Sequence, residues 1–376
     1  MGEVFKEYSE KNHIELPALT IIQGGGTVKR DESDRNLMYD KSNLSSYKMV
    51  KKDDFIVHLR SFEGGLEKAS MDGIVSPAYH TFQGENVDSR FYYPYFRSHE
   101  FIKKKLIPHV YGIRDGRSID IEGMKTIEIP YISLREQQLI GNYLDCIDHL
   151  ITFHQRKCEQ TKKLKKYMLQ KMFPKEGQTV PEVRFEGFTD AWEKRKLPEF
   201  VSFFNGLTYN PDDVQETGTL VLRSSNVKNG EIVDADNVYV SDKVATVENV
   251  QEGDIIVVVR NGSRALIGKH AQIKDTMPNT VIGAFMSGMR SEHSSFVNTL
   301  LDTSTFENQI TKNMGATINQ ITGYMFSKMV FMIPLEEEQD KIGVYFSNLD
   351  HLITLHQRKC DELQNIKKFM LQNMFI

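Results

Sequence analysis

Two stretches of the chain place apolar residues at alternating spacings of four and three. The first stretch runs from Ile140 to Met172 and the second from Ile342 to Met374. This is the period of a coiled-coil seam, in which a narrow apolar stripe on one helix faces a partner helix. The residues assigned to the seam are Ile140, Leu144, Ile147, Ile151, His154, Cys158 and Met168 in the first stretch, and Ile342, Phe346, Leu349, Ile353, His356, Cys360 and Met370 in the second.

The two stretches are copies of one another. Residues 140–173 align without gaps on residues 342–375, and 20 of the 34 positions are identical. Pro130 and Pro334 precede the copies and Pro174 follows the first, so each copy is predicted to be one long helix. A helix over about 134–172 would be ~58 Å long at 1.5 Å per residue. Such a rod needs a partner for its apolar stripe, and the other copy is the obvious one.

The stretches outside the helices are predicted to be mixed α/β domains with many short strands. Strand-like segments occur at 55–59, 125–129, 254–259 and 329–333, with glycine-rich turns around them. The predicted fold class is therefore α+β: two mixed α/β domains separated by two long helices that form an antiparallel coiled coil. The predicted parts are a first domain (1–132), a first helix (133–174), a linker (175–184), a second domain (185–334) and a second helix (335–376).

Composition limits the class of protein. Hydrophobic residues make up 40% of the chain and charged residues 26%, which suits packed domains and argues against a disordered chain. No run of 18 apolar residues and no apolar signal core occur, and three cysteines are too few for a disulfide framework. We therefore expect a cytoplasmic protein. The net charge of −4 argues mildly against nucleic acid unless positive charge is concentrated locally.

The search for catalytic motifs in the sequence is negative. No GxxxxGK[ST] phosphate loop is present, and no candidate nucleophile sits on a tight glycine turn. His154 and Cys158 are spaced i, i+4, as are His356 and Cys360, and together they could hold zinc. Because the apolar seam continues around them, we favour a role in setting the register of the helices. No catalytic residue, metal ligand or cofactor site is assigned to this chain.

Positive charge gathers on one helix. Residues 155–172 carry seven Lys or Arg against one acid, Glu159. A solvated helix face explains this run, and so does contact with phosphates or an acidic partner.

Polar loops at strand ends carry the strongest binding signal. The segment "RNGSRALIGKH" (260–270) follows a predicted strand, and "HLRSFEGGLEK" (58–68) occupies the matching place in the first half. Arginine reads guanine and asparagine reads adenine through paired hydrogen bonds, so this mixture suits DNA base edges. The candidate DNA-binding residues, with those of nearby loops, are Arg60, Ser61, Lys68, Tyr79, Arg114, Arg117, Arg260, Asn261, Ser263, Arg264, Lys269, His270, Asn279, Thr280, Asn319 and Gln320.

With these features the chain resembles the specificity subunit of a type I restriction–modification system. The resemblance rests on the doubled helix, the lead-in "VPEVRFEGFTDAWEKRKL" (180–197), and the loops "LRSFEGG", "VSPAY" and "RNGSRALIGKHA…PNTVIGAF". It covers essentially the whole chain. It implies two target-recognition domains that each read half of a bipartite DNA site, with the paired helices holding them apart.

The same resemblance implies partners and cofactors. Two methyltransferase subunits would carry S-adenosylmethionine and methylate the N6 of adenine. Two motor–nuclease subunits could join and cleave unmodified DNA with ATP and Mg²⁺. This chain would then be a non-catalytic recognition subunit, in agreement with the negative motif search.

One departure from the family pattern concerns the first domain. The lead-in precedes the second domain only, and Met1–Phe5 falls where Leu197–Val201 falls in the second half. The first domain is therefore expected to lack its lead-in.

Geometry suggests how such a chain would read DNA. Lys and Arg would contact phosphates while Arg260, Asn261 and Arg264 read one half-site, and Arg60, Ser61 and Lys68 contact the other. Half-sites about one helical turn apart, near 34 Å, follow if both domains approach one face of the duplex. Two other hypotheses remain open: a free-standing DNA-binding or scaffold protein without a methyltransferase, and an enzyme with a His/Cys metal.

Overall fold

The computed structural model describes residues 1–33, 41–58, 65–112, 118–314 and 319–375. Residue contacts divide the chain into two compact units. Unit 1 comprises Met1–His154 and Arg358–Ile376, and unit 2 comprises Gln155–Gln357. Each unit therefore contains a globular part and about half of each of the two long helices.

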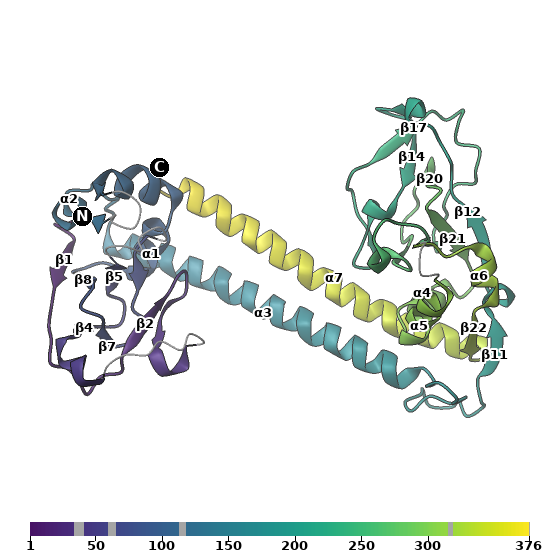
Figure 1. Cartoon of the computed structure of the whole chain (residues 1–376), viewed down its shortest axis with the longest axis horizontal. Helices are drawn as coiled ribbons and strands as arrows, with labels where there is room; N and C mark the ends of the chain where they lie inside the picture. Colours follow the sequence, from purple (N-terminus) through teal and green to yellow (C-terminus); the bar gives the residue numbers. More distant parts are fainter. Residues whose placement is uncertain (34–40, 59–64, 113–117, 315–318, 376) are drawn as a thin grey trace. The chain divides into compact units, whose positions relative to one another are not determined.

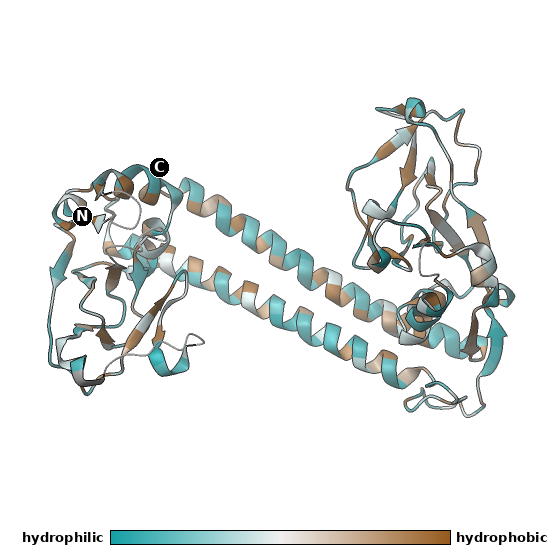
Figure 2. Cartoon of the chain, viewed as in Figure 1, coloured by the Kyte–Doolittle hydropathy of each residue, from teal (hydrophilic) through white to brown (hydrophobic). Residues whose placement is uncertain are grey.

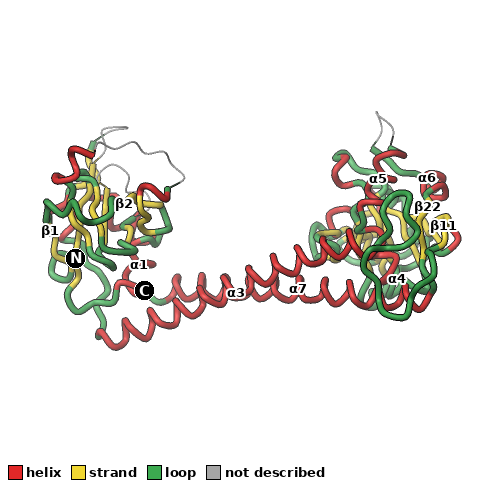
Figure 3. The backbone as a smooth tube through the Cα atoms, turned by 90° about the horizontal axis from the view of Figure 1, so that it is seen from below, coloured by secondary structure: helices red, strands yellow, loops and turns green. Residues whose placement is uncertain are grey.

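The two long helices are α3 (Leu134–Met172) and α7 (Glu336–Asn373) (Figure 1). Their bounds agree with the helix predicted over about 134–172 and with its copy. In unit 1 the early part of α3 contacts the late part of α7, and in unit 2 the late part of α3 contacts the early part of α7 (Figure 3). The helices therefore pair antiparallel, as predicted.

The pairing repeats the same contacts in each unit. In unit 1 the Sγ atom of Cys360 lies 3.7 Å from the carbonyl oxygen of Ile151, and in unit 2 the Sγ atom of Cys158 lies 3.8 Å from that of Ile353. Ion pairs follow the same rule: Lys367 with Asp148 in unit 1, and Lys165 with Asp350 in unit 2. All of the predicted seam residues are buried or half-buried, and hydrophilic residues alternate with them along both helices (Figure 2).

The described residues of unit 2 form two four-stranded sheets and two two-stranded sheets. One sheet has the order β12-β21-β18-β19 and is antiparallel; the other has the order β13-β17-β14-β20, in which β14 and β20 are parallel. The strands are β11 (Glu193–Lys196), β12 (Ser202–Asn205), β13 (Val214–Gln215), β14 (Thr219–Leu222), β15 (Val227–Lys228), β16 (Glu231–Ile232), β17 (Val238–Val240), β18 (Ile255–Val258), β19 (His270–Gln272), β20 (Thr280–Ile282), β21 (Met286–Arg290) and β22 (Val330–Ile333). The helices are α4 (Ser294–Leu301), α5 (Ser304–Asn313) and α6 (Gly323–Lys328).

The described residues of unit 1 form one four-stranded sheet and three two-stranded sheets. The larger sheet has the order β1-β8-β5-β6. The strands are β1 (Phe5–Tyr8), β2 (Leu19–Ile22), β3 (Gly26–Lys29), β4 (Lys48–Val50), β5 (Phe55–His58), β6 (Glu67–Lys68), β7 (Gly73–Val75), β8 (Tyr79–Gly84), β9 (Val110–Tyr111) and β10 (Ser118–Ile119). The helices are α1 (Ser89–Phe96), the π-helix η3 (Glu100–Leu106) and α2 (Ile121–Lys125).

The two units share one plan although their sequences differ. The order β1-β8-β5-β6 matches β12-β21-β18-β19 strand for strand, and a helix follows the second strand of each set. At the start of this helix, Lys68 Nζ lies 3.4 Å from Ser89 Oγ in unit 1, and Gln272 Nε2 lies 2.9 Å from Ser294 Oγ in unit 2. The predicted fold of two mixed domains on paired helices is confirmed.

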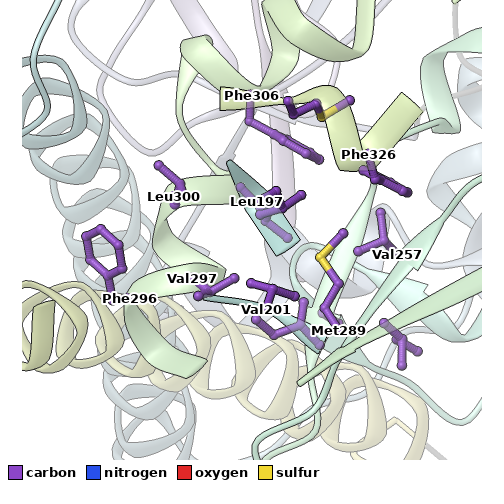
Figure 4. Close-up of a cluster of buried hydrophobic side chains, with 14 of the residues drawn as sticks. Leu197, Val201, Val257, Met289, Phe296, Val297, Leu300, Phe306 and Phe326 are labelled. Atoms are coloured by element: carbon purple, nitrogen blue, oxygen red, sulfur yellow. The ribbon is translucent and has the colours of Figure 1, made fainter. Parts of the chain in front are cut away.

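The core of unit 2 lies between its antiparallel sheet and its helices. Apolar residues of β18 and β21 pack against one face of α4 and against the start of α5 (Figure 4). β18 reads as four consecutive buried apolar residues, Ile255–Val258, because both of its faces are covered. The labelled side chains of this cluster are Leu197, Val201, Val257, Met289, Phe296, Val297, Leu300, Phe306 and Phe326.

The close approach of α4 to α7 depends on Gly343. A Cβ atom there would lie 2.8 Å from the backbone nitrogen of Phe296. We expect Gly343→Ala to lower the free energy of unfolding by about 1–3 kcal/mol, because backbone atoms must separate to make room. Denaturant unfolding checks this, with Gly323→Ala as control because no atom lies within 4 Å of its Cβ position. A Gly343→Ala variant as stable as the parent would contradict the packing described.

One predicted strand does not form. Residues 125–129 were expected to be extended and paired, but α2 ends at Lys125 and the residues that follow are irregular. In unit 2 most of the segment with a similar sequence, residues 329–333, forms β22 because β11 pairs with it. In unit 1 no strand among the described residues takes the place of β11. Instead the carbonyl oxygens of this region accept hydrogen bonds from Met1, Lys105 and Tyr92.

No helix among the described residues is long and apolar enough to cross a membrane.

Candidate nucleic-acid interface

Three segments of unit 2 meet at one edge of the antiparallel sheet. They follow β18, separate β20 from β21, and precede α6. Val259 and Arg260 donate backbone hydrogen bonds to the carbonyl oxygen of Phe285 at 2.9 and 3.2 Å, and Ile321 donates to that of Val259 at 2.8 Å. Arg260 and Gln320 form an isolated antiparallel bridge. Because backbone bonds join the segments, the sheet fixes the position of the side chains they carry.

Two asparagines brace this edge. Asn261 Nδ2 donates to Ser224 Oγ at 3.1 Å, and its Oδ1 accepts from the backbone nitrogen of Ser263 at 3.0 Å. Asn319 Nδ2 donates to the carbonyl oxygen of Gly262 at 3.1 Å. Both amides therefore hold the loop in shape. Asn261 was predicted to read a base edge, but its engaged amide suits a positioning role better.

Two arginines at the same edge are exposed. The guanidinium of Arg260 lies over the ring of Phe285, 5.1 Å from its centroid, and Arg264 begins the short helix η9 (Arg264–Leu266). Neither is paired with an acidic side chain among the described residues. Phe285 is 56% exposed. We call Arg260, Ser263, Arg264, Phe285 and Gln320 the loop cluster. It offers hydrogen-bond donors, fixed positive charge and an aromatic face to a ligand.

Such a set of groups suits a nucleic acid. Guanidinium groups make paired hydrogen bonds to phosphate oxygens or to the O6 and N7 atoms of guanine. Stacking of Arg260 on Phe285 limits the conformations of the guanidinium, so less entropy is lost when it binds.

Asn279 and Thr280 lie away from the loop cluster. Asn279 precedes β20 and Thr280 is its first residue, whereas Phe285 follows the end of the strand. Asn279 Nδ2 donates to Asp242 Oδ1 at 3.0 Å, and its Oδ1 accepts from Thr219 Oγ1 at 2.7 Å. Thr280 is buried. Strand β20 therefore separates these two residues from the edge with which the sequence grouped them.

His270 also lies elsewhere, in the interior of unit 2. Its Nε2 is 3.4 Å from Asp302 Oδ1, and the other oxygen of Asp302 is 2.6 Å from Lys165 Nζ, which also pairs with Asp350. His270 is on β19, the second strand of the hairpin, where it faces the helices, and Lys269, just before it, is half-buried. The network anchors the globular part of unit 2 on α3 and α7.

The charges of this network shift one another's pKa. Burial raises the pKa of Asp302, but the hydrogen bond and charge of His270, together with Lys165, outweigh it and lower the pKa to about 2. Burial lowers the pKa of His270, but its hydrogen bond to Asp302 outweighs burial, so the net pKa is raised above 6.5.

These shifts predict how stability depends on pH. The depressed pKa of Asp302 stabilises the fold above pH 3.8, and this contribution is lost as pH falls through 2. The raised pKa of His270 stabilises the fold below pH 6.5, and this contribution is lost as pH rises through the folded value. We therefore expect Asp302→Asn to cost about 2 kcal/mol between pH 4 and 6, and less on either side. Denaturant unfolding of both proteins from pH 2.5 to 9 checks this; a difference that does not vary with pH would contradict it.

In unit 1 the structure describes two of the predicted residues. Lys68 Nζ lies 3.0 Å from Asp53 Oδ1 and 5.9 Å from the centroid of the Tyr93 ring, so its charge is already engaged. Tyr79 is half-buried against a small apolar cluster. Arg60, Ser61, Arg114 and Arg117 lie outside the described residues.

The prediction matched the segment that contains Lys68 with the loop after β18, but the registers of the two sheets place Lys68 elsewhere. Phe55 is opposite Lys68 and Ile255 is opposite Gln272, so Lys68 corresponds to Gln272 at the start of the helix. It does not correspond to a residue of the loop after β18.

Sequence reasoning missed Ser224 and Phe285. Ser224 follows β14 and Phe285 follows β20, and the ends of these parallel neighbours lie at the same edge. A signal was present: "TLVLRSSN" (219–226) is a strand that ends in polar residues, like "VVVRNGS" (257–263). That the two strands are parallel neighbours could not be read from the chain.

The basic stretch of α3 is partly neutralised. Lys162 pairs with Glu159, Lys165 with Asp302 and Asp350, and Lys171 with Glu182. At least three of the seven basic residues therefore have carboxylate partners, and all of these partners except Glu159 lie outside the stretch itself. This favours an anchoring role for part of the helix over a continuous phosphate-binding face.

Comparison with known proteins supports the architecture. Over its full length the chain is similar to the S subunit of a type I restriction–modification system from M. genitalium, with a TM-score of 0.60, 14% identity and 97% of that chain covered. The HsdS subunit from Thermoanaerobacter tengcongensis has a TM-score of 0.48 and 16% identity, with 100% of this chain and 95% of that chain covered. The likeness to the M. genitalium S subunit shows that the two chains share a fold.

Sequence comparison gives the family. Residues 189–365 match the family model of the type I restriction modification DNA specificity domain. The type I restriction enzyme MjaVIII specificity subunit of Methanocaldococcus jannaschii is 24% identical over 276 residues, which are 70% of this chain. The match spans 62% of the length of that relative. The predicted resemblance to the type I restriction–modification specificity subunits is confirmed.

Proposed function

We propose that this chain selects the DNA sequence on which a type I restriction–modification complex acts. Each unit reads one half of a bipartite site, and the paired helices join the two readers. In unit 2 the reading surface is the loop cluster. The observation that carries this proposal is the pair of exposed arginines, Arg260 and Arg264, on a loop fixed by backbone hydrogen bonds.

The side chains divide into two roles. Arg260 and Arg264 contact base edges or phosphates, and Ser263 and Gln320 contribute further polar groups beside them. Asn261 and Asn319 hold the loop in shape through their amides. Phe285 supports the guanidinium of Arg260.

The chemistry belongs to partners under this proposal. Two methyltransferase subunits that carry S-adenosylmethionine dock on the helices and their neighbouring domains and methylate the N6 of adenine. Two motor–nuclease subunits with ATP and Mg²⁺ complete the restriction complex. The chain itself acts as a recognition subunit in the cytoplasm, where its DNA target lies.

DNA binding with and without a partner tests the assembly. We expect the isolated chain to bind duplex DNA weakly, and the complex with its methyltransferase to bind tightly at one split motif. The affinity of the complex for other sequences should fall steeply with salt, because phosphate contacts dominate there. Tight, motif-specific binding by the isolated chain, unchanged by the methyltransferase, would instead establish a free-standing DNA-binding protein.

A further inference from the structure

The segment Val183–Lys196 makes a continuous set of contacts in unit 2. Val183 donates a backbone hydrogen bond to Lys171 at 2.9 Å. The guanidinium of Arg184 then meets the carboxylate of Glu338 on α7 with two hydrogen bonds, of 2.7 and 2.8 Å. The Glu338 side chain is only 1% exposed, so the ion pair is sealed from solvent.

Aromatic residues and a strand continue the same segment. The ring of Phe185 lies 6.1 Å from that of Tyr345 on α7, and Lys341 Nζ lies 4.7 Å from the centroid of Phe188. Trp192 enters the core, 5.7 Å from the ring of Phe173. Strand β11 then pairs with β22 along its whole length.

Unit 1 repeats the surface that receives this segment. In the duplicated helices Glu136 corresponds to Glu338, and Tyr143 to Tyr345. The structure supports this equivalence through the next residue of each helix. Gln137 and Gln339 are both buried, and each donates a hydrogen bond to the carbonyl oxygen five residues earlier, at 2.8 and 3.0 Å.

The surroundings of the surface are repeated too. Phe375 lies 5.3 Å from Phe91 in unit 1, as Phe173 lies 6.0 Å from Phe296 in unit 2. The backbone nitrogen of Met1 donates to Ile127 in unit 1, where that of Leu197 donates to Met329 in unit 2. Ile127 is therefore the equivalent of Met329. The four residues that follow it, 128–131, take the position that β22 has in unit 2.

In unit 1 no described strand pairs with this surface, and its apolar side chains are exposed. Leu139 is 63% exposed, Tyr143 50% and Tyr131 65%. Glu136 is exposed and forms no ion pair with a described residue, and residues 128–131 have no strand beside them. We call residues 128–131 with Glu136, Leu139 and Tyr143 the acceptor face.

We propose that the acceptor face binds a polypeptide segment with the chemistry of Val183–Lys196. Such a segment carries an arginine next to a phenylalanine, then a second phenylalanine, a tryptophan and an extended strand. Its arginine pairs with Glu136, its first phenylalanine lies against Tyr143, and its strand adds to residues 128–131. Leu139 stands where Lys341 contacts Phe188, so an apolar contact replaces the cation–π contact there.

A labelled peptide tests this directly. A fluorescent peptide with the sequence of residues 178–198 is titrated with the full chain and its anisotropy is followed. We expect saturable binding of one peptide per chain. Glu136→Gln should weaken it about tenfold or more, because a hydrogen bond between two charged groups becomes one to a neutral amide. Glu85→Gln changes an exposed glutamate outside the acceptor face and should leave the affinity for the peptide unchanged. A peptide of scrambled sequence should not bind.

A photo-crosslinking residue at the position of Phe185 in the peptide locates the site. The proposal predicts crosslinks to α3 near Tyr143. Crosslinks to α7 near Tyr345 would mean that the peptide displaces the native segment of unit 2, and would overturn the proposal. So would absence of saturable binding, or binding that Glu136→Gln does not change. A dimer of the chain that Leu139→Asp separates would assign the face to a second copy, and would overturn the proposed occupant.

Discussion

Replacing Arg184 with alanine is expected to lower the free energy of unfolding of unit 2 by about 3–5 kcal/mol. The change leaves the carboxylate of Glu338 buried without its cation, and Glu338 is among the most buried charged side chains of the unit. It also removes two charge-assisted hydrogen bonds that fasten the lead-in segment to α7. Glu338→Ala should lower the free energy of unfolding by a similar amount, because it leaves the guanidinium of Arg184 without its carboxylate partner.

Denaturant unfolding of the full chain measures this effect, and two further variants show its cause. Glu159→Ala breaks an exposed ion pair with Lys162 and should change stability by less than about 1 kcal/mol. The double change Arg184→Met with Glu338→Leu should recover much of the loss, because no unpaired charge remains buried. If Arg184→Ala were no more harmful than Glu159→Ala, the ion pair would not hold the segment in place.

Replacing Arg260 and Arg264 together with alanine is expected to remove sequence-specific DNA binding. An arginine that makes paired hydrogen bonds to a guanine contributes about 1–3 kcal/mol of discrimination, or roughly 5- to 150-fold. Losing both contacts at one half-site should therefore remove the preference for the cognate sequence. The fold should be unaffected, because both side chains are exposed. Titration of the methyltransferase-bound chain with its cognate duplex measures the change.

A charge-matched control separates recognition from general electrostatics. Lys243 is exposed and follows β17, near Asp242 and Asn279 at the opposite end of β14 and β20 from the loop cluster. Lys243→Ala should therefore leave specific affinity nearly unchanged. Single variants distinguish the two roles: a base-reading arginine alters which sequences bind, whereas a phosphate-binding one weakens all sequences alike. Equal affinity of the double variant and the parent chain would refute the assignment of the loop cluster.

The helical framework could be predicted from the sequence because its information is local. Alternating spacings of four and three fix which stripe of each helix is apolar, and prolines mark where the helices begin and end. The duplication identified the partner of each helix, because two helices with the same apolar stripe can bury their stripes against each other. Cys158 and Cys360 therefore lie in the interface, as their positions in the stripe predicted.

The strands and binding residues depended on contacts that a single sequence does not contain. Residues 125–129 and 329–333 look alike, yet only the second segment is a strand, because β11 lies beside it. His270 and Arg264 are six residues apart, but a hairpin turns one inward to Asp302 and leaves the other exposed. Asn279 and Phe285 are separated by a strand that carries them to opposite ends. In each case the position of the residue depends on which strands pair in the folded chain, and distance along the sequence does not reveal that pairing.

The central claim is that this chain determines where DNA is methylated. The most direct test is to co-express it with the proposed methyltransferase subunit and to map methylated adenines by methylation-sensitive sequencing. The account predicts one split motif whose methylation requires the chain, and which is lost or altered in the Arg264→Ala variant. Methylation of the same sites at the same level without the chain would contradict the account.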